Sequence, residues 1–235
     1  MKPIVVLQNE DMAPPGYLGH ALDRRGVDWR VVRLDTGESL PEAEDVSGVA
    51  VLGGPMGVYD DEEFPFLVDE KRFLVECTKA DVPVLGICLG CQLLADGLGG
   101  RAYVADRAEI VFAPIEPTPD GLADSVVAVL AGRRTIRYHQ DTFDVPPGAT
   151  LLATGGGFDQ AFRMGSAVGL QPHPEVTPDL FRGWVGTERG RQRAIDLGAD
   201  PDAVIAAFTA AEAEAEATAA LVFDAWIDEV LHSLG

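Results

Sequence analysis

Short apolar runs alternate with helix-like segments through the first part of the chain, and this pattern restricts the folds that it can adopt. The apolar runs have the length and composition of buried strands: Pro3–Leu7, Trp29–Arg33, Gly48–Leu52 and Pro83–Ile87. Helix-like segments lie between them, including Gly16–Arg25 and Phe66–Ala80. Strands that alternate with helices form a parallel sheet with helices on both faces. The sequence therefore predicts an α/β fold on an open, mostly parallel sheet.

The pattern changes between about Arg101 and Leu170, where turn residues are frequent and the strand-like runs are shorter. The strands expected in this region are Glu109–Pro114, Thr150–Thr154, Gln160–Met164 and Ala167–Leu170. Runs this close together favour antiparallel pairing. We expect this part to add an antiparallel or mixed portion to the sheet.

From Thr177 onward the chain is predicted to be helical. Residues 203–231 contain no Gly or Pro and carry an apolar stripe at three- and four-residue steps. A continuous helix over Pro201–His232 would be roughly 48 Å long, longer than one domain needs. We therefore expect either a break near Ala211–Ala217 or a partner on the stripe, such as a second copy of the chain. Residues 1–184 are predicted to form one domain, with 185–235 as a helical extension packed on it.

Composition limits where such a chain functions. Of its 235 residues 47% are hydrophobic, enough for a core that needs neither disulfides nor metal. No run of 18 apolar residues and no signal-like segment is present, so we predict a soluble, cytoplasmic protein without a membrane partner. The three cysteines, Cys77, Cys88 and Cys91, make no disulfide framework and fit a reducing compartment.

The net charge of −20 argues against a second class of partner. So acidic a chain repels phosphate backbones and anionic surfaces. We predict no nucleic-acid partner.

Residues 82–90, VPVLGICLG, place Cys88 between a predicted strand and a predicted helix. Gly86 and Gly90 flank it in a G-x-C-x-G pattern, which a nucleophile elbow needs because the sharp turn leaves no room for a β-carbon on either side. The thiol would lie at a helix N-terminus, where the partial positive charge favours thiolate. This predicts a cysteine nucleophile, although a free cysteine of this kind is also often an inert core residue.

Two further segments supply partners for Cys88. His173 and Glu175 follow a predicted strand, and residues two apart on extended backbone project the same way. The histidine could accept the thiol proton while the glutamate orients its ring. Gly54 follows another strand, where its N–H could turn toward an oxyanion, and Leu89 supplies the amide after the nucleophile.

These segments resemble a known family. The motifs in question are Gly53–Gly57 (GGPMG), Gly86–Gln92 (GICLGCQ) and His173–Glu175 (HPE). In this order and spacing they are similar to the class I glutamine amidotransferases, most closely to stand-alone proteins likened to the glutaminase domain of GMP synthase. The resemblance extends from Pro3 to about Trp184 and implies a flavodoxin-like sheet.

The resemblance also implies roles. Cys88 would attack the side-chain amide of glutamine to give a γ-glutamyl thioester and ammonia, with His173 as base and then acid, and Glu175 orienting it. Gly54 and Leu89 would hold the oxyanion. The implied substrate-binding residues are Gly53, Gln92, His139, Gln140 and Asp141, the last three reading the α-amino and α-carboxylate groups. No cofactor is implied, and four scattered histidines without ligand spacing predict no metal site.

Three functions stay open at this point. A glutaminase would pass ammonia to a separate synthetase chain, since no P-loop is present and too few residues follow Glu175 for a synthetase domain. A hydrolase of γ-glutamyl peptides or amides would use the same triad. A non-catalytic regulatory module is the third reading, and loss of a triad residue would favour it.

Two side chains also have alternative readings. Cys91 is either a small core residue or a redox partner that traps oxidised Cys88 as a disulfide. His139 is either a loop histidine with local partners or part of the substrate pocket.

Overall fold

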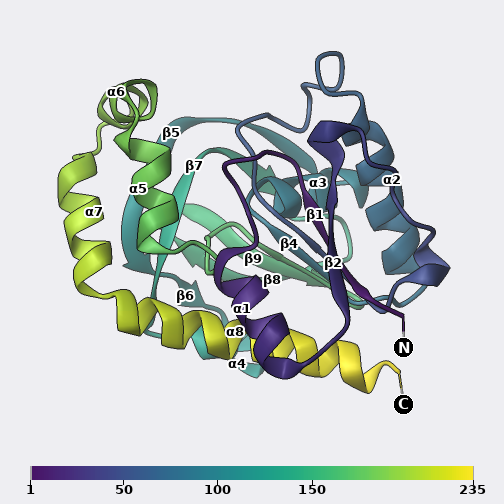
Figure 1. Ribbon diagram of the computed structural model, residues 1–235. Helices are drawn as coiled ribbons and strands as arrows, with labels where there is room; N and C mark the ends of the chain where they lie inside the picture. Colours follow the sequence, from purple (N-terminus) through teal and green to yellow (C-terminus); the bar gives the residue numbers. More distant parts are fainter. Residues whose placement is uncertain (1, 235) are drawn as a thin grey trace.

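The computed structural model describes residues 2–234, and its centre is an eight-stranded sheet of order β2-β1-β3-β4-β10-β9-β8-β6 (Figure 1). The strands are β1 (Ile4–Gln8), β2 (Trp29–Arg33), β3 (Gly48–Val51), β4 (Val84–Ile87), β6 (Glu116–Pro117), β8 (Thr150–Gly155), β9 (Phe158–Met164) and β10 (Ala167–Leu170). The β2-β1-β3-β4-β10 portion is parallel, and β9, β8 and β6 extend it in antiparallel pairing. The predicted mostly parallel α/β sheet, with its mixed later portion, is confirmed.

Helices lie on both faces of this sheet (Figure 1). They are α1 (Gly16–Arg25), α2 (Phe66–Lys79), α3 (Leu89–Gly97), α4 (Pro119–Ala123), α5 (Pro178–Gly186), α6 (Glu188–Asp196), α7 (Pro201–Ala210) and α8 (Glu212–His232), with three short 3-10 turns at Leu34–Thr36, Ala43–Asp45 and Ala128–Leu130. Successive residues of a strand point to opposite faces. Accordingly Ile4 and Val6 lie in one buried cluster with α1 and α8, whereas Val5 and Leu7 lie in another with α2 and α3.

Two strands stand outside the main sheet. β5 (Arg101–Pro114) and β7 (Arg134–Asp144) pair with each other as an antiparallel ribbon, with a register shift between Val104 and Glu109. They are the longest strands of the described residues, so the expectation of shorter strands after Arg101 is wrong here. The first half of β5 is largely exposed and polar, and therefore lacks the apolar run by which a buried strand is recognised.

The C-terminal helix breaks at Ala211, so the expected break near Ala211–Ala217 is confirmed. Ala211 has φ −111° and ψ 21°, outside the helical range, and separates α7 from α8. The two helices contact different elements: Phe208 of α7 packs on Phe112 of β5 and Phe181 of α5, while α8 packs on α1. The break lets both helices contribute side chains to one buried apolar cluster.

This packing bears on two further predictions. Val222, Trp226 and Val230 are buried within the chain, so the apolar stripe of α8 packs on the chain's own core. The predicted oligomer through this helix stays a prediction. The division of the chain at residue 184 also stays a prediction. Residue 184 lies within α5.

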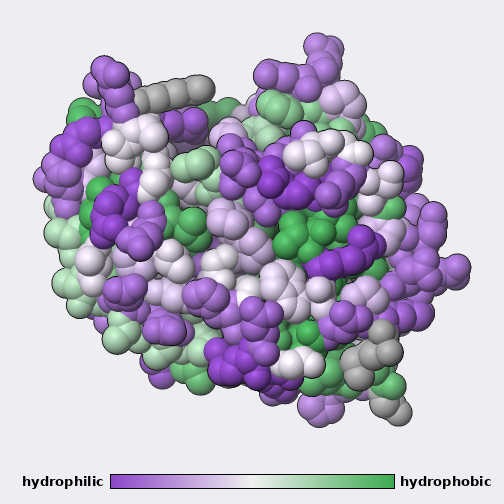
Figure 2. Space-filling view, in the orientation of Figure 1, coloured by the Kyte–Doolittle hydropathy of each residue, from purple (hydrophilic) through white to green (hydrophobic). Residues whose placement is uncertain are grey.

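The surface is largely hydrophilic on the face drawn in Figure 2, with small apolar patches and a notch between α6 and the loop that joins β3 to α2. Among residues 2–234 no helix combines the length and the apolar character needed to span a membrane.

Candidate active site

Cys88 lies between β4 and α3 in a conformation that non-glycine residues rarely adopt. Its φ is +52° and its ψ is −106°. Among the described residues other than glycine, Asp81 also has a positive φ, which is rare for residues with a side chain. A Cβ on Gly86 would lie 2.6 Å from the carbonyl oxygen of Gly90, and one on Gly90 would lie 2.4 Å from that of Val51. Neither site can hold a side chain without displacing backbone. The G-x-C-x-G segment therefore has the geometry of a nucleophile elbow.

His173 and Glu175 follow β10, which is the neighbour of β4 in the sheet. The His173 N–H donates to the carbonyl oxygen of Ile136 at 2.7 Å, which fixes the backbone of the histidine. Its Nδ1 lies 2.7 Å from Oε1 of Glu175, and both side chains are 3% exposed. The carbonyl oxygen of Glu175 in turn accepts from the N–H of Tyr17 at 2.8 Å. The predicted pair is thus held by a strand, a ribbon and α1.

The pKa of His173 is raised well above its ordinary value. Burial acts to lower this pKa, but the negative charges of Glu175 and Cys88 and hydrogen bonds to both outweigh it. Cys88 and His173 therefore lie close enough for the charge of one to affect the other. A histidine that keeps its proton here can stabilise negative charge on the Cys88 sulfur.

The glycine loop after β3 closes the other side of the sulfur. A Cβ on Gly53 would lie 3.0 Å from Cε1 of His173 and 3.6 Å from Cβ of Cys88. One on Gly54 would lie 2.9 Å from Cδ2 of Leu89. Leu89 is the first residue of α3, so its N–H has no partner within that helix. The two predicted oxyanion donors are thus neighbours beside Cys88, at the carboxyl edge of the sheet.

Gln92 is buried and bridges three elements. Its Nε2 donates to the carbonyl oxygen of Asp141 at 3.0 Å and to Oε1 of Gln171 at 3.1 Å. These bonds connect α3 to β7 and to the segment that carries His173. The side chain supports the site, and its predicted contact with substrate stays a prediction.

The other predicted substrate residues lie together on β7 but point in different directions. The side chain of His139 is 1% exposed, with Nε2 3.1 Å from Oε2 of Glu109 and Nδ1 2.9 Å from the carbonyl oxygen of Asp141. Asp141 accepts the Tyr59 hydroxyl on Oδ2 at 2.6 Å. Gln140 lines a cavity of about 560 Å³. Of the three, His139 is thus buried in an internal network, whereas Gln140 and Asp141 are partly exposed.

Sequence reasoning missed an aromatic group at the site. The ring of Trp184 meets that of His173 edge-on, with centroids 5.2 Å apart, and stacks on Tyr138 at 6.0 Å. Its Nε1 donates to the carbonyl oxygen of Met12 at 2.6 Å. No motif marks Trp184 in the sequence, because it reaches the site only through the packing of α5.

Cys91 is fully buried in α3. Burial, and after it the charge of Cys88, raises the pKa of the Cys91 thiol well above its ordinary value. A buried thiol that resists ionisation is a weak nucleophile. The core reading of Cys91 fits this setting, and a redox role stays a prediction.

Possible metal ligands do not gather in the described part of the chain, where no group of three or more His, Cys, Asp or Glu side chains could hold an ion. The site residues named above are those of acid–base and nucleophilic chemistry. The predicted absence of a cofactor stays a prediction.

Comparisons with known proteins identify relatives of this chain. Residues 16–183 match the family described as glutamine amidotransferase class-I. The glutamine amidotransferase-like protein YfeJ of Salmonella typhimurium is 32% identical over 177 residues, which cover 72% of this chain and 73% of that protein. A GMP synthase (glutamine-hydrolyzing) of Thermomicrobium roseum is 35% identical over 149 residues, 62% of this chain but only 26% of its own length.

A solved structure extends the likeness to nearly the whole chain. The crystal structure of a glutamine amido transferase from Methylobacillus flagellatus superposes with a TM-score of 0.86 and 27% identity. The match covers 97% of this chain and 95% of that one, so it includes the helices after residue 183.

Proposed function

The chain belongs to the class I glutamine amidotransferase family, and on this premise we propose that it hydrolyses the side-chain amide of glutamine, or of another γ-glutamyl amide, through a thioester on Cys88. One observation carries the proposal: a cysteine at a strained elbow lies beside a buried histidine, and Nδ1 of this histidine is 2.7 Å from a buried carboxylate. This is the arrangement of an activated nucleophile.

In the first half of the proposed reaction, the Cys88 sulfur forms a bond to the amide carbon and the thiol proton passes to His173. The electron pair of the carbonyl moves to oxygen, to which the N–H groups of Gly54 and Leu89 would donate. The C–N bond then breaks as His173 gives its proton to nitrogen, and ammonia or an amine leaves. Glu175 accepts from Nδ1–H and keeps Nε2 aimed at the sulfur.

In the second half, His173 takes a proton from water, whose oxygen attacks the γ-glutamyl thioester. The C–S bond breaks, the Cys88 sulfur recovers a proton from His173, and glutamate leaves. Trp184, against the edge of the His173 ring, limits the freedom of that ring in both halves.

The ammonia released from glutamine needs an acceptor. The chain spans about a quarter of the length of the GMP synthase that it matches. We infer a separate ammonia-accepting partner when glutamine is the substrate. A hydrolase of γ-glutamyl peptides needs no such partner, and the cavity of about 560 Å³ beside Gln140 supports it by offering room for a larger leaving group. A reducing, cytoplasmic location fits the three free and buried cysteines.

The test is release of ammonia or amine and of glutamate from glutamine, γ-glutamyl peptides and γ-glutamyl methylamide, with Cys88→Ser as control. We expect turnover in the wild type and its loss in the variant. A glutamine-analogue diazoketone, followed by mass spectrometry, reports on the sulfur directly and does not require a partner chain. Equal turnover by the wild type and Cys88→Ser, or labelling at Cys77 or Cys91 in place of Cys88, would overturn the assignment.

A further inference from the structure

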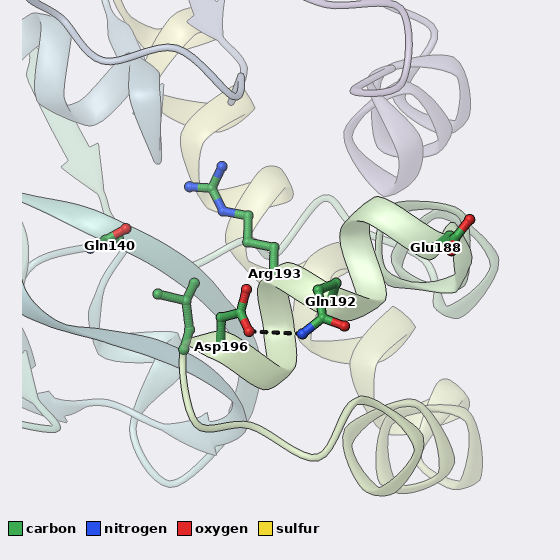
Figure 3. Close-up of a pocket in the computed structure, with 6 residues that line it drawn as sticks. Gln140, Glu188, Gln192, Arg193 and Asp196 are labelled. Atoms are coloured by element: carbon green, nitrogen blue, oxygen red, sulfur yellow. Dashed lines mark hydrogen bonds between the residues drawn. The ribbon is translucent and has the colours of Figure 1, made fainter.

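A positive charge without a carboxylate partner faces the cavity beside the site. Arg193 belongs to α6, beyond the residues that match the family, and lines the cavity together with Gln140 (Figure 3). Its side chain extends away from Gln192 and Asp196, which bond to each other at 2.8 Å. Within residues 2–234 no acidic side chain lies at ion-pair distance from Arg193, whereas Arg191 on the same helix pairs with Asp202.

Arg30, Arg107 and Arg133 also form no ion pair among the described residues, but of these four arginines only Arg193 lines the cavity. Acidic residues outnumber basic ones by 38 to 18, so carboxylates are available to most surface arginines. An arginine that meets none of them at the edge of a cavity is free to bind one on a ligand.

Arg193 is electrostatically connected to the reacting residues. Burial raises the pKa of Tyr138, the Arg193 guanidinium acts to lower it, and the charge of Cys88 adds to the rise. Arg193 and Cys88 therefore both lie close enough to Tyr138 for their charges to affect its pKa. Tyr138 also stacks on Trp184, whose ring meets that of His173, so packed aromatic rings connect Tyr138 to the triad.

Asp141 supplies the opposite charge near the same place. Burial, and then the hydrogen bond and charge of Asp141, raise the pKa of Tyr59, and the charge of Arg193 opposes them. The Tyr59 hydroxyl thus bonds to the Asp141 carboxylate and also feels the charge of the Arg193 guanidinium. A carboxylate for an ammonium group and a guanidinium for a carboxyl group complement an amino-acid zwitterion. His139 cannot supply the cation, since its ring is buried against Glu109.

We propose that Arg193 binds a carboxylate of the γ-glutamyl substrate at the mouth of the site, opposite Asp141. This inference rests on the proposed function. The carboxylate has two sources: the α-carboxylate of the γ-glutamyl group, common to all these substrates, or a carboxylate on the leaving group, as in γ-glutamylglycine. Either would form a charge-assisted, bidentate contact with the guanidinium.

The experiment compares Arg193→Met with the matched control Arg191→Met, which removes the same charge from the same helix but outside the cavity. KM and kcat are measured on glutamine, glutamine α-amide, γ-glutamylglycine and γ-glutamyl methylamide. Loss of a charge-assisted contact predicts a rise in KM of about 10- to 100-fold in Arg193→Met. If the α-carboxylate is bound, KM rises for glutamine, γ-glutamylglycine and γ-glutamyl methylamide, and the variant no longer discriminates against glutamine α-amide. If the leaving-group carboxylate is bound, KM rises for γ-glutamylglycine alone.

Inactivation by the glutamine-analogue diazoketone separates this inference from the proposed function. Its concentration dependence gives a binding constant and a rate of Cys88 labelling for each protein, also where turnover needs a partner. Weaker binding only in Arg193→Met supports recognition of the α-carboxylate. If Arg193→Met matches the wild type and Arg191→Met in labelling and on every substrate, the role of Arg193 is overturned and the proposed function stays intact. A wild type that is neither labelled nor active would overturn the proposed function, and this inference with it.

Discussion

The Nδ1 atom of His173 lies 2.7 Å from Oε1 of Glu175, in a setting that almost excludes water from both side chains. The second carboxylate oxygen, Oε2, has no hydrogen-bond partner within the described residues. A buried carboxylate with one free oxygen is costly to maintain. The charge of Glu175 is thus concentrated on the histidine, where it favours the protonated ring.

Replacing Glu175 with Gln should therefore impair the chemistry more than the fold. The amide preserves the volume but removes the charge that raises the pKa of His173. We expect kcat/KM to fall about 100-fold or more, as when the orienting acid of a triad is neutralised. Because the proton is held less tightly, the pH at which His173 loses it falls, and the alkaline limb of the kcat/KM profile moves to lower pH.

The control for this prediction is Glu188→Gln, an exposed carboxylate of α6 at the rim of the cavity. It should leave the pH profile unchanged. If Glu175→Gln reduces the rate without moving the alkaline limb, Glu175 acts only by holding the ring in place.

A second buried carboxyl group predicts how stability depends on pH. Glu70 of α2 is fully buried, its Oε1 accepts from Nδ2 of Asn9 at 3.2 Å, and neither Oε2 of Glu70 nor Oδ1 of Asn9 has a partner among residues 2–234. A proton on Oε2 would let these two atoms bond to each other. Burial raises the pKa of Glu70 from 4.5 to about 8, against the lowering effect of Asn9.

Proton binding by Glu70 decides whether the stability of the fold rises or falls with pH. Between these two pKa values the folded chain holds a proton that the unfolded chain has released, so stability falls as pH rises, by about 1.4 kcal/mol per unit. The stabilising contribution is complete below the pKa of the unfolded state and is lost as pH rises through that of the folded state. Denaturant unfolding at pH 5 and pH 9 should reveal a loss on the order of 4 kcal/mol in the wild type that Glu70→Gln lacks.

The background titration of this acidic chain is measured with Glu76→Gln, an exposed residue of the same helix. This variant should follow the wild type at both pH values. A Glu70→Gln protein with the same pH dependence as the wild type would mean that Glu70 is ionised in the fold.

The sequence was sufficient for the triad because each member lies in a local motif. Cys88 is marked by its flanking glycines, and His173 and Glu175 share one extended segment at the end of a strand. Trp184 could not be predicted, since it reaches the His173 ring only through the packing of α5 against elements distant in sequence. For the same reason β5 was expected only over Glu109–Pro114 and β7 was not expected at all: they pair with each other outside the main sheet, where the first half of β5 is largely exposed and β7 buries polar side chains such as Arg137 and His139.

The elbow glycines give a prediction about packing. Gly90→Ala would place a Cβ 2.4 Å from the carbonyl oxygen of Val51, which is fixed in β3. The backbone must shift, and we expect a loss of about 2 kcal/mol or more in the free energy of unfolding, together with slower labelling of Cys88. Gly183→Ala in α5 is the matched helical control, since its Cβ would meet Met12 at an ordinary 3.6 Å. This variant should be as stable as the wild type or more so, by up to about 1 kcal/mol. Equal stability of Gly90→Ala and the wild type would contradict the close contact.

The last prediction concerns the C-terminal helices as part of the same folding unit. Trp226 of α8 is fully buried, and its Cζ2 lies 3.5 Å from where a Cβ on Gly48 of β3 would be. Trp226→Ala leaves a large cavity between α8 and the sheet, for which we expect a loss of about 3–5 kcal/mol in the free energy of unfolding. Trp226→Phe fills most of this space and should lose less. Leu221→Ala, at an exposed position of the same helix, should change stability by no more than about 0.5 kcal/mol. Because β3 also carries the loop of Gly53 and Gly54, Trp226→Ala should unfold in one transition, with loss of Cys88 labelling over the same denaturant range. Two separate transitions would instead mean that residues after 184 fold as an independent unit.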